Sequence, residues 1–324
     1  MKRPDMSAPP ALSVVVATRN RPKPLHGLMR SLDQEILEGG YYELIVVDDG
    51  SEPPLDASRC PGAILLRTAG LERSRARNLG AEAARGRYLL FLDDDLELEF
   101  GCLQEHLLAH HLWPNALVIG KVRVPSAWYG TPVGRFRATI DTAAVPRVAG
   151  PHASADYCTA QNMSVEREAF LALGGFDPGL VVSEDQDLGR RWLASGHDVA
   201  YAPDASVIHH DATDTLAKYL RRMEFGYFHM VAFARKYPDD PDNRRRAEVN
   251  GPVQIGREPP ARSVLKLVKG MLGWPPVLAL LLCFIQWRER RSPWDQKLKR
   301  WYRFAIGIAI QRGWRAGQKA AAGK

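Results

Sequence analysis

The N-terminal part of the chain alternates short apolar runs with longer amphipathic stretches. The runs are five or six residues long and rich in Val, Ile and Leu, which is typical of strands buried on both faces of a sheet. The first stretch between them has apolar residues at helical spacing. The pattern predicts strands at 12–17, 43–47, 63–67 and 88–92 and helices at 25–37 and 71–85. Strands that alternate with helices indicate an α/β sheet.

After residue 100 the pattern is less regular. It predicts a helix at 100–111, a strand at 117–124, a loop rich in Gly and Pro at 125–155, a strand at 157–165, helices at 166–173 and 187–195, extended pieces at 199–202 and 205–208, and a helix at 215–237. We therefore expect one α/β domain at 11–237, preceded by a flexible leader at 1–10.

Polar clusters follow three of the predicted strands, at 18–21, 48–51 and 93–95. If these strands are parallel, the clusters meet at one edge of the sheet, where ligands bind in open α/β folds. Asp93, Asp94 and Asp95 repel one another, so a cation is expected to neutralise them. Carboxylate oxygens suit a divalent ion such as Mg²⁺ or Mn²⁺. An acidic turn without a ligand is the alternative.

Two later segments carry further candidates for chemistry. Glu184 and Asp185 come just before the helix predicted at 187–195, where they could face a cleft, whereas Asp187 could cap that helix. His209 and His210 end a predicted strand, and a histidine in that place could complete a metal site. Neither a GxGxxG dinucleotide motif nor a phosphate-binding P-loop occurs in the sequence.

Charge and cysteine content narrow the functional classes. The 4 cysteines are far apart, which signals neither a zinc knuckle nor a disulfide framework. The net charge is +7, but residues 288–324 alone contain 11 Lys or Arg against 2 Asp or Glu. The basic character therefore belongs to the tail, and no nucleic-acid-binding face is predicted.

The C-terminal part is predicted to be a linker at 238–262 and a basic, Trp-rich helical tail at 263–324. The stretch 264–287 is the most apolar of the chain, yet its continuous apolar part is shorter than the roughly 20 residues that span a bilayer. We expect an interfacial segment on an anionic membrane surface, with a helical hairpin packed on the catalytic body as the alternative. The expected interface anchors are Trp274, Trp287, Trp294, Trp301 and Trp314.

Six short motifs occur in a characteristic order. They are VVVATRNR at 14–21, VVDDGS at 46–51, ARNLG at 76–80, FLDDD at 91–95, GGFD at 174–177 and EDQDL at 184–188. With them, the chain resembles the inverting family 2 glycosyltransferases over about residues 11–235. The resemblance implies the GT-A fold, an α/β Rossmann-like mixed sheet of nucleotide-diphospho-sugar transferases, here with a C-terminal helical, partly apolar appendage.

The resemblance implies roles for residues of the donor pocket. Asp49 corresponds to the acid that contacts the nucleobase, and Thr18 and Arg21 would lie in the same pocket. Arg77 corresponds to an arginine that helps to hold the nucleotide.

The resemblance also implies a metal site and a catalytic base. Asp93 and Asp94 would approach the ribose and the shell of a divalent cation, Mn²⁺ or Mg²⁺, and Asp95 would bind that cation directly. His209 corresponds to a late histidine of some GT-A metal sites, with His210 as the competing choice. In the EDQDL motif, Asp185 corresponds to the catalytic base, with Glu184 as the alternative.

The expected function is metal-dependent transfer of a sugar from a nucleotide-diphospho-sugar to a hydroxyl of a saccharide or lipid-linked acceptor, with inversion. We expect a role in cell-surface polysaccharide or glycolipid assembly, in the cytoplasm at the inner face of the membrane. At 186–192 four residues rather than two separate the Gln from the Arg-Trp pair of the Gln-x-x-Arg-Trp signature of processive synthases, so a single addition is favoured. A nucleotidyltransferase and a non-catalytic sugar-nucleotide-binding or membrane scaffold protein are the alternatives.

Overall fold

The computed structural model describes residues 8–323 except residue 39 and the segments 142–145 and 212–214. Most of the predicted leader at 1–10 lies outside the described residues. The chain divides into two compact units. The first consists of Met1–Pro125 and Asp141–Asp211, and the second of Ser126–Ile140 and Ala212–Lys324.

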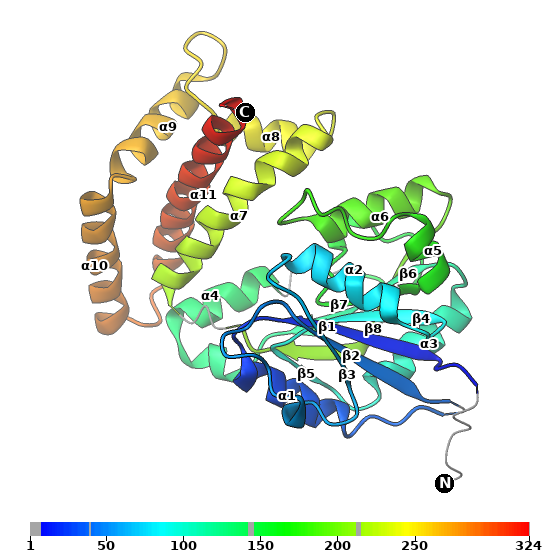
Figure 1. Cartoon of the computed structure of the whole chain (residues 1–324). Coiled ribbons are helices and arrows are strands. Elements are labelled where there is room, and N and C mark those ends of the chain that lie inside the picture. The colour runs from blue at the N-terminus through cyan, green and yellow to red at the C-terminus, as the bar shows by residue number, and fades with distance from the viewer. Residues whose placement is uncertain (1–7, 39, 142–145, 212–214, 324) are drawn as a thin grey trace. The chain divides into compact units, whose positions relative to one another are not determined.

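The first unit is built on an eight-stranded mixed sheet with the order β3-β2-β1-β4-β7-β6-β8-β5 (Figure 1). Its strands are β1 (Leu12–Thr18), β2 (Tyr42–Asp48), β3 (Ile64–Arg67), β4 (Tyr88–Asp93), β5 (Leu96–Leu98), β6 (Leu117–Arg123), β7 (Asn162–Glu166) and β8 (Val199–His209). Strands β3, β2, β1 and β4 are parallel, and β7 is antiparallel to both of its neighbours. The predicted mixed α/β sheet is confirmed.

Both faces of this sheet are covered, as the apolar strands predict. In β1, Leu12, Val14 and Val16 belong to one core cluster, and Val15 belongs to the other, because successive strand residues point to opposite faces. Helices α1 (Pro22–Leu32) and α3 (Cys102–Leu112) cover the first face, and α2 (Arg73–Ala83), α5 (Arg167–Ala172) and α6 (Glu184–Ala194) cover the second.

The strand register brings the predicted polar clusters together. Thr18 of β1 pairs with Asp48 of β2, and Ala17 pairs with Asp93 of β4. The carboxyl ends of three parallel strands therefore meet at one edge of the sheet. The alternation of strands and helices predicts that these strand ends lie together. A helix that connects two neighbouring strands returns the chain to the same end of the sheet, so that the strands run parallel.

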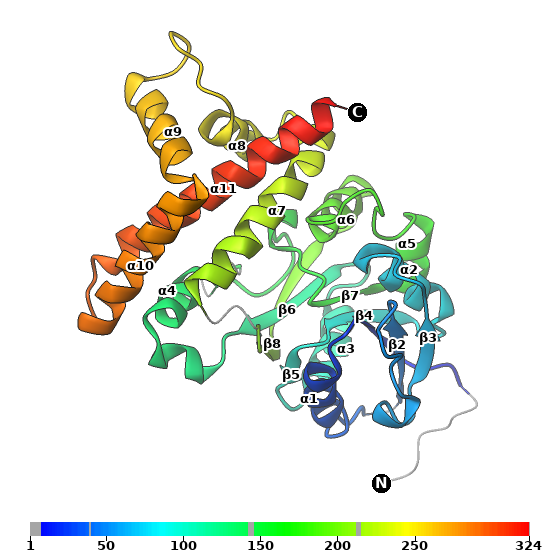
Figure 2. The same ribbon diagram turned by 60° about the vertical axis from the view of Figure 1, so that its left-hand side comes forward.

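The second unit is helical. It contains α4 (Pro132–Asp141), α7 (Leu216–Lys236), α8 (Pro241–Asn250), α9 (Pro260–Leu272), α10 (Pro275–Arg291) and α11 (Leu298–Ala322). In both views α11 lies between α7 and the α9–α10 pair (Figures 1 and 2). Gly313 and Gly317 let α11 approach α7 closely, since a Cβ at either position would clash with a backbone carbonyl of α7.

Several elements differ from the predictions. Residues 125–155, expected to be a loop, contain a short 3₁₀ helix (Ser126–Gly130) and α4, and the expected linker at 238–262 contains α8. The second unit includes α7, whereas the sequence analysis assigned 11–237 to one domain. Helix α6 begins at Glu184 rather than at Asp187, so Glu184 and Asp185 lie in its first turn rather than before it.

Candidate active site

The three consecutive acids after β4 have different partners. Asp93 accepts a hydrogen bond from Arg77 Nη2 at 2.5 Å. Asp94 is buried and accepts hydrogen bonds from Thr18 Oγ1 at 2.6 Å and from Arg21 Nη1 at 2.7 Å. Asp95 accepts a hydrogen bond from Arg21 Nη2 at 2.6 Å. The structure thus joins Thr18 and Arg21 to the acids at the end of β4.

Burial and charge give these acids different proton affinities. Burial and the neighbouring acids raise the pKa of Asp94 to about 6, although Thr18 and Arg21 oppose the rise. Burial acts in the same direction on Asp95, but His209 and Arg21 outweigh it and hold the pKa of Asp95 well below its usual range. Asp95 is therefore ionised at neutral pH and available to a cation.

Three of the predicted residues form a group that can hold a metal ion. One ligand atom each from Asp93, Asp95 and His209 lies within 4.8 Å of the other two. Among the described residues, no donor forms a hydrogen bond of good geometry with the buried Oδ1 of Asp95, which lies 3.2 Å from Nε2 of His209 as an ion pair. Two carboxylates and an imidazole suit a divalent cation such as Mn²⁺. The residues present therefore fit the ion that the resemblance implies.

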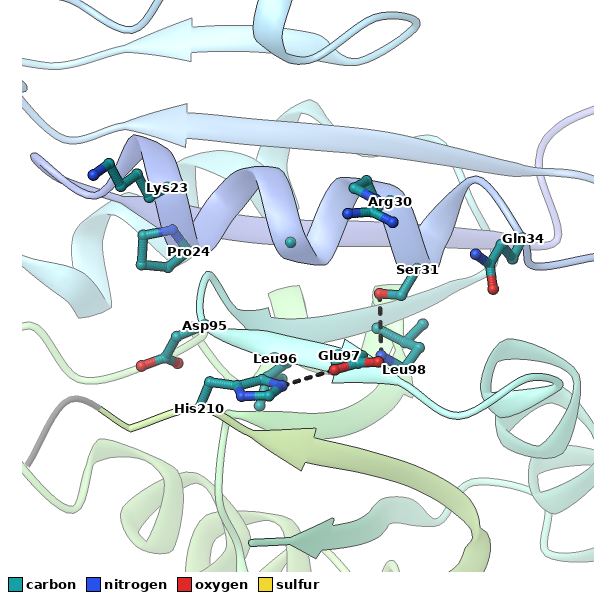
Figure 3. Close-up of a pocket in the computed structure, with 11 residues that line it drawn as sticks. Lys23, Pro24, Arg30, Ser31, Gln34, Asp95, Leu96, Glu97, Leu98 and His210 are labelled. Atoms are coloured by element: carbon teal, nitrogen blue, oxygen red, sulfur yellow. Dashed lines mark hydrogen bonds and ion pairs between the residues drawn. The ribbon is translucent and has the colours of Figure 1, made fainter. Parts of the chain in front are cut away.

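His210 has a different environment from His209. Its Nε2 lies 2.8 Å from Glu97 Oε2, and both residues line a cavity of about 380 Å³ between α1 and β5. Figure 3 shows Asp95 at the end of this cavity where Lys23 and Pro24 lie. Asp95 thus belongs both to the cavity wall and to the metal-binding group. The geometry favours His209 over His210 as the ligand.

Arg77 connects the metal-binding group to the first turn of α6. It is 2% exposed, and its Nη1 donates to Glu184 Oε1 at 2.8 Å while its Nη2 donates to Asp93. Charge-assisted bonds of this kind are roughly twice as strong as neutral ones. One guanidinium therefore fixes the end of β4 relative to the start of α6.

Asp185 is placed differently from Glu184. Its carboxylate accepts hydrogen bonds from the backbone N–H groups of Ala160 at 3.2 Å and Gln186 at 2.8 Å. Burial and the charge of Glu184 raise the pKa of Asp185 to about 7. A carboxylate with a pKa near 7 suits a general base. Glu184 is engaged by Arg77, so the arrangement favours Asp185 for that role.

Asp49, the expected nucleobase contact, already has several partners. Its carboxylate accepts hydrogen bonds from Thr68 Oγ1 and Leu71 N, both at 2.6 Å, and from Glu72 N at 3.1 Å. Asp49 therefore fixes the loop between β3 and α2. Its neighbour Asp48 caps the following turn through Ser51 N and Leu55 N.

Arg73 was missed by the sequence analysis. It is exposed, and the acidic charges of Asp93 and then of Glu184 and Asp185 raise its pKa. It lies one helical turn before Arg77 on α2, so counting back four residues from the recognised arginine would have found it.

The fold and this edge of the sheet define a class. The mixed sheet, with acids at the ends of β2 and β4 and a histidine at the end of β8, has the arrangement that the resemblance to GT-A glycosyltransferases implied. The structure of mannosyltransferase PcManGT from Pyrobaculum calidifontis in complex with GDP-Man and Mn²⁺ is similar, with a TM-score of 0.54 at 17% identity over 96% of this chain and 89% of that chain.

Sequence comparison finds similarity to glycosyltransferases. Residues 13–135 match the family described as Glycosyl transferase family 2. The chain is 28% identical over 236 residues to a pre-mycofactocin glycosyltransferase of Mycobacterium tuberculosis, covering 70% of this chain and 48% of that protein. It is 32% identical over 87 residues to an uncharacterized glycosyltransferase of Haemophilus influenzae, covering 26% of this chain and 29% of that protein.

Residues 13–135 therefore match glycosyl transferase family 2, and the chain has the fold of a GT-A glycosyltransferase, as the resemblance implied. It spans about half the length of the Mycobacterium relative.

Proposed function

We propose that this protein transfers a sugar from a nucleotide-diphospho-sugar to an acceptor hydroxyl, with inversion at the sugar. One observation carries the proposal. The metal-binding group of Asp93, Asp95 and His209 is linked through a single buried arginine, Arg77, to the turn that holds Asp185. A site for a diphosphate-bound cation and a candidate base therefore belong to one rigid network.

Asp93, Asp95 and His209 would hold a divalent cation. Bound there, the cation would neutralise charge that develops on a departing diphosphate. We infer Mn²⁺ rather than Mg²⁺, because imidazole is a poor ligand for Mg²⁺ and a better one for transition metals. The Mn²⁺ in the structurally similar Pyrobaculum protein is consistent with this inference.

Asp185 would accept the proton of the acceptor hydroxyl as the oxygen bonds to the sugar, and would release that proton to water afterwards. The proton moves to a carboxylate whose pKa is raised by burial, which makes it a stronger base than an exposed aspartate. A single base suffices for a single displacement, and a single displacement inverts the configuration at the sugar.

The nucleotide would lie along the ends of β1, β2 and β4. Thr18 and Arg21 would line this pocket together with Asp94, and the loop that Asp49 fixes would form its other side. Arg73, with an exposed guanidinium, would face the diphosphate. The panel of donors described next identifies the donor sugar and its nucleobase.

Turnover of a panel of UDP-, GDP- and dTDP-sugars, with Mn²⁺ and with EDTA, tests the proposal. Mn²⁺-dependent release of nucleoside diphosphate is expected from at least one donor. Asp185→Asn should lose turnover by about 10²–10⁴-fold and retain donor binding, whereas the control Glu97→Gln should retain both. Release of pyrophosphate from a nucleoside triphosphate would instead indicate a nucleotidyltransferase, and donor binding without turnover would indicate a non-catalytic protein.

We further propose that the acceptor is a saccharide or lipid-linked saccharide used in cell-surface polysaccharide or glycolipid assembly at the cytoplasmic face of the membrane. The apolar character of 264–287 supports this proposal. Transfer to a lipid-linked acceptor in detergent micelles, compared with transfer to the same saccharide free in solution, tests it. A preference for the free saccharide would contradict the lipid-linked assignment.

A further inference from the structure

Helix α9 has its polar face buried and its apolar face exposed. Lys266 is 2% exposed and Lys269 is 9% exposed, whereas Leu267 is 57% exposed and Met271 is 73% exposed. Val264, Leu265 and Val268 are exposed as well. Helices of a water-soluble domain show the opposite distribution. In water, this arrangement leaves apolar area exposed while two ammonium groups are desolvated.

The buried face of α9 is held by specific polar contacts. Nζ of Lys266 donates to Glu258 Oε2 at 2.5 Å and to the backbone oxygen of Pro252 at 3.0 Å. Glu258 also accepts a hydrogen bond from Ser263 Oγ at 2.8 Å. Separating the two charges would leave each without its partner and would also break the hydrogen bonds that support the pair. The helix therefore cannot rotate its leucines inward without losing these contacts.

The exposed apolar surface continues beyond α9. Leu280, Phe284 and Trp287 are exposed on α10 at the helical spacing of one face, and Trp294 and Trp301 follow. Phe284 contacts the rings of both Trp287 and Trp301. We call this surface, formed by the exposed apolar residues of α9, α10 and the two following tryptophans, the apolar face.

Cations border the apolar face. Arg290 and Arg291 end α10, and Lys299 and Arg300 begin α11, and all four are exposed. Arg291 lies over the ring of Trp287 at 4.8 Å. Trp314, expected to be an anchor, is instead 1% exposed in the helical core. That expectation was wrong, because α11 presents this position to its neighbours rather than to solvent.

Among the described residues, no single helix is long and apolar enough to cross a bilayer. Helices α9 and α10 reach the required length and apolar content only when they are counted together, and the chain bends by 92° between them. We propose that the apolar face binds the surface of an anionic phospholipid bilayer, with α9 and α10 in the headgroup region. Exposed aliphatic residues, flanking tryptophans and bordering arginines are the features of helices that lie in this region. The proposal does not depend on the glycosyltransferase activity.

Flotation of the full chain with vesicles tests the proposal. We expect binding to vesicles of phosphatidylcholine and phosphatidylglycerol at 7:3, and much weaker binding to phosphatidylcholine alone. Leu267→Asp should weaken binding by about a hundredfold, since it removes an exposed leucine that the bilayer would bury and adds a negative charge. The paired change Arg290→Gln and Arg300→Gln should weaken binding to the anionic vesicles by about thirtyfold.

Phe100→Asp is the matched control, because Phe100 is 75% exposed on the first unit. It should leave vesicle binding unchanged. Circular dichroism melts of all variants show whether they fold. As a second measurement, brominated lipid should quench the fluorescence of Trp274, and Trp274→Phe should reduce the quenched fraction while Trp113→Phe should not.

Three results would overturn the proposal. The first is no flotation of the folded wild-type chain with anionic vesicles. The second is equal binding by wild type and folded Leu267→Asp. The third is a stable dimer in lipid-free buffer that Leu267→Asp converts to a monomer, with no vesicle binding by either form, because the occupant of the apolar face would then be a second copy of the chain.

Discussion

The ion pairs of Arg77 give the sharpest prediction about the site. Arg77→Met removes a 2% exposed guanidinium and leaves Glu184 buried without its cation and Asp93 without its strongest neighbour. Breaking a buried ion pair by removing one partner costs about 3–5 kcal/mol. At about 2–4 °C per kcal/mol for a domain of this size, the melting temperature should fall by about 6–20 °C.

Arg77 bonds two acids, Asp93 and Glu184, and this predicts the outcome of a double-mutant cycle between Arg77 and Glu184. Glu184→Gln should cost less than Arg77→Met, because Arg77 still bonds Asp93 at 2.5 Å in that variant. Adding Glu184→Gln to Arg77→Met should restore part of the lost stability, since the unpaired buried charge is then removed.

Thermal melts followed by circular dichroism at pH 7.5 measure all of these effects. Arg75→Met is the matched control, because Arg75 is an exposed arginine of the same helix, and its melting temperature should stay within about 2 °C of wild type. The bridging role of Arg77 is refuted if the melting temperature of Arg77→Met also stays within about 2 °C of wild type. It is refuted as well if the double variant melts at a lower temperature than Arg77→Met alone.

The other predictions concern the metal ligand, the base and the core. His209→Ala should abolish tight Mn²⁺ binding and His210→Ala should retain it, as measured by calorimetric titration; equal affinities would remove His209 from the site. The pKa of Asp185 is raised to about 7, so log(kcat/KM) should rise with pH at a slope near one to a midpoint at or below 7, and a flat profile between pH 5 and 8 would contradict this assignment. Burial lowers the pKa of His110 to about 3, so the unfolded chain binds a proton that the folded chain does not. Stability should therefore fall as pH drops from about 6.5, by up to about 1.4 kcal/mol per pH unit. In denaturant unfolding between pH 6.5 and 4, His110→Phe should flatten this fall and the exposed neighbour His111→Phe should not; identical slopes would disprove the effect.

The strand-end cluster could be predicted because it follows from local pattern and one topological rule. Apolar runs identify β1, β2 and β4, and parallel connections bring Thr18, Asp48 and Asp93 to one edge. The position of His209 could also be inferred, since it ends a strand. By contrast, the order of β7, β6 and β8 depends on long-range pairing, antiparallel between β7 and its neighbours and parallel between β6 and β8, for which the local sequence carries no signal.

The sequence predicts an interfacial segment at 264–287, but it does not predict which residues of α9 are exposed. Its periodicity indicates an amphipathic helix, and hydropathy alone would turn the leucines inward. The pairing of Lys266 with Glu258 decides otherwise, and such a tertiary contact overrides a local preference. The same limit applies to Trp314, which composition grouped with the exposed tryptophans although it is buried.

Arg77 shows a third kind of limit. Its motif indicates a nucleotide-binding arginine, but a motif does not reveal partners that lie 16 and 107 residues away in the sequence. Both terminal nitrogens of the Arg77 guanidinium pair with acids, Nη1 with Glu184 and Nη2 with Asp93. Its influence on a nucleotide would therefore act through the position of those acids.

Above all, we expect the acids at the end of β4, with His209, to hold a divalent cation that binds a diphosphate. Electron paramagnetic resonance titration of Mn²⁺, with and without UDP or GDP, tests it most directly. We predict one tight Mn²⁺ per wild-type chain, tighter with nucleotide, lost in Asp95→Asn and kept in Glu97→Gln. Tight Mn²⁺ binding that persists in Asp95→Asn, or its absence from the wild-type chain with every nucleotide, would contradict the claim.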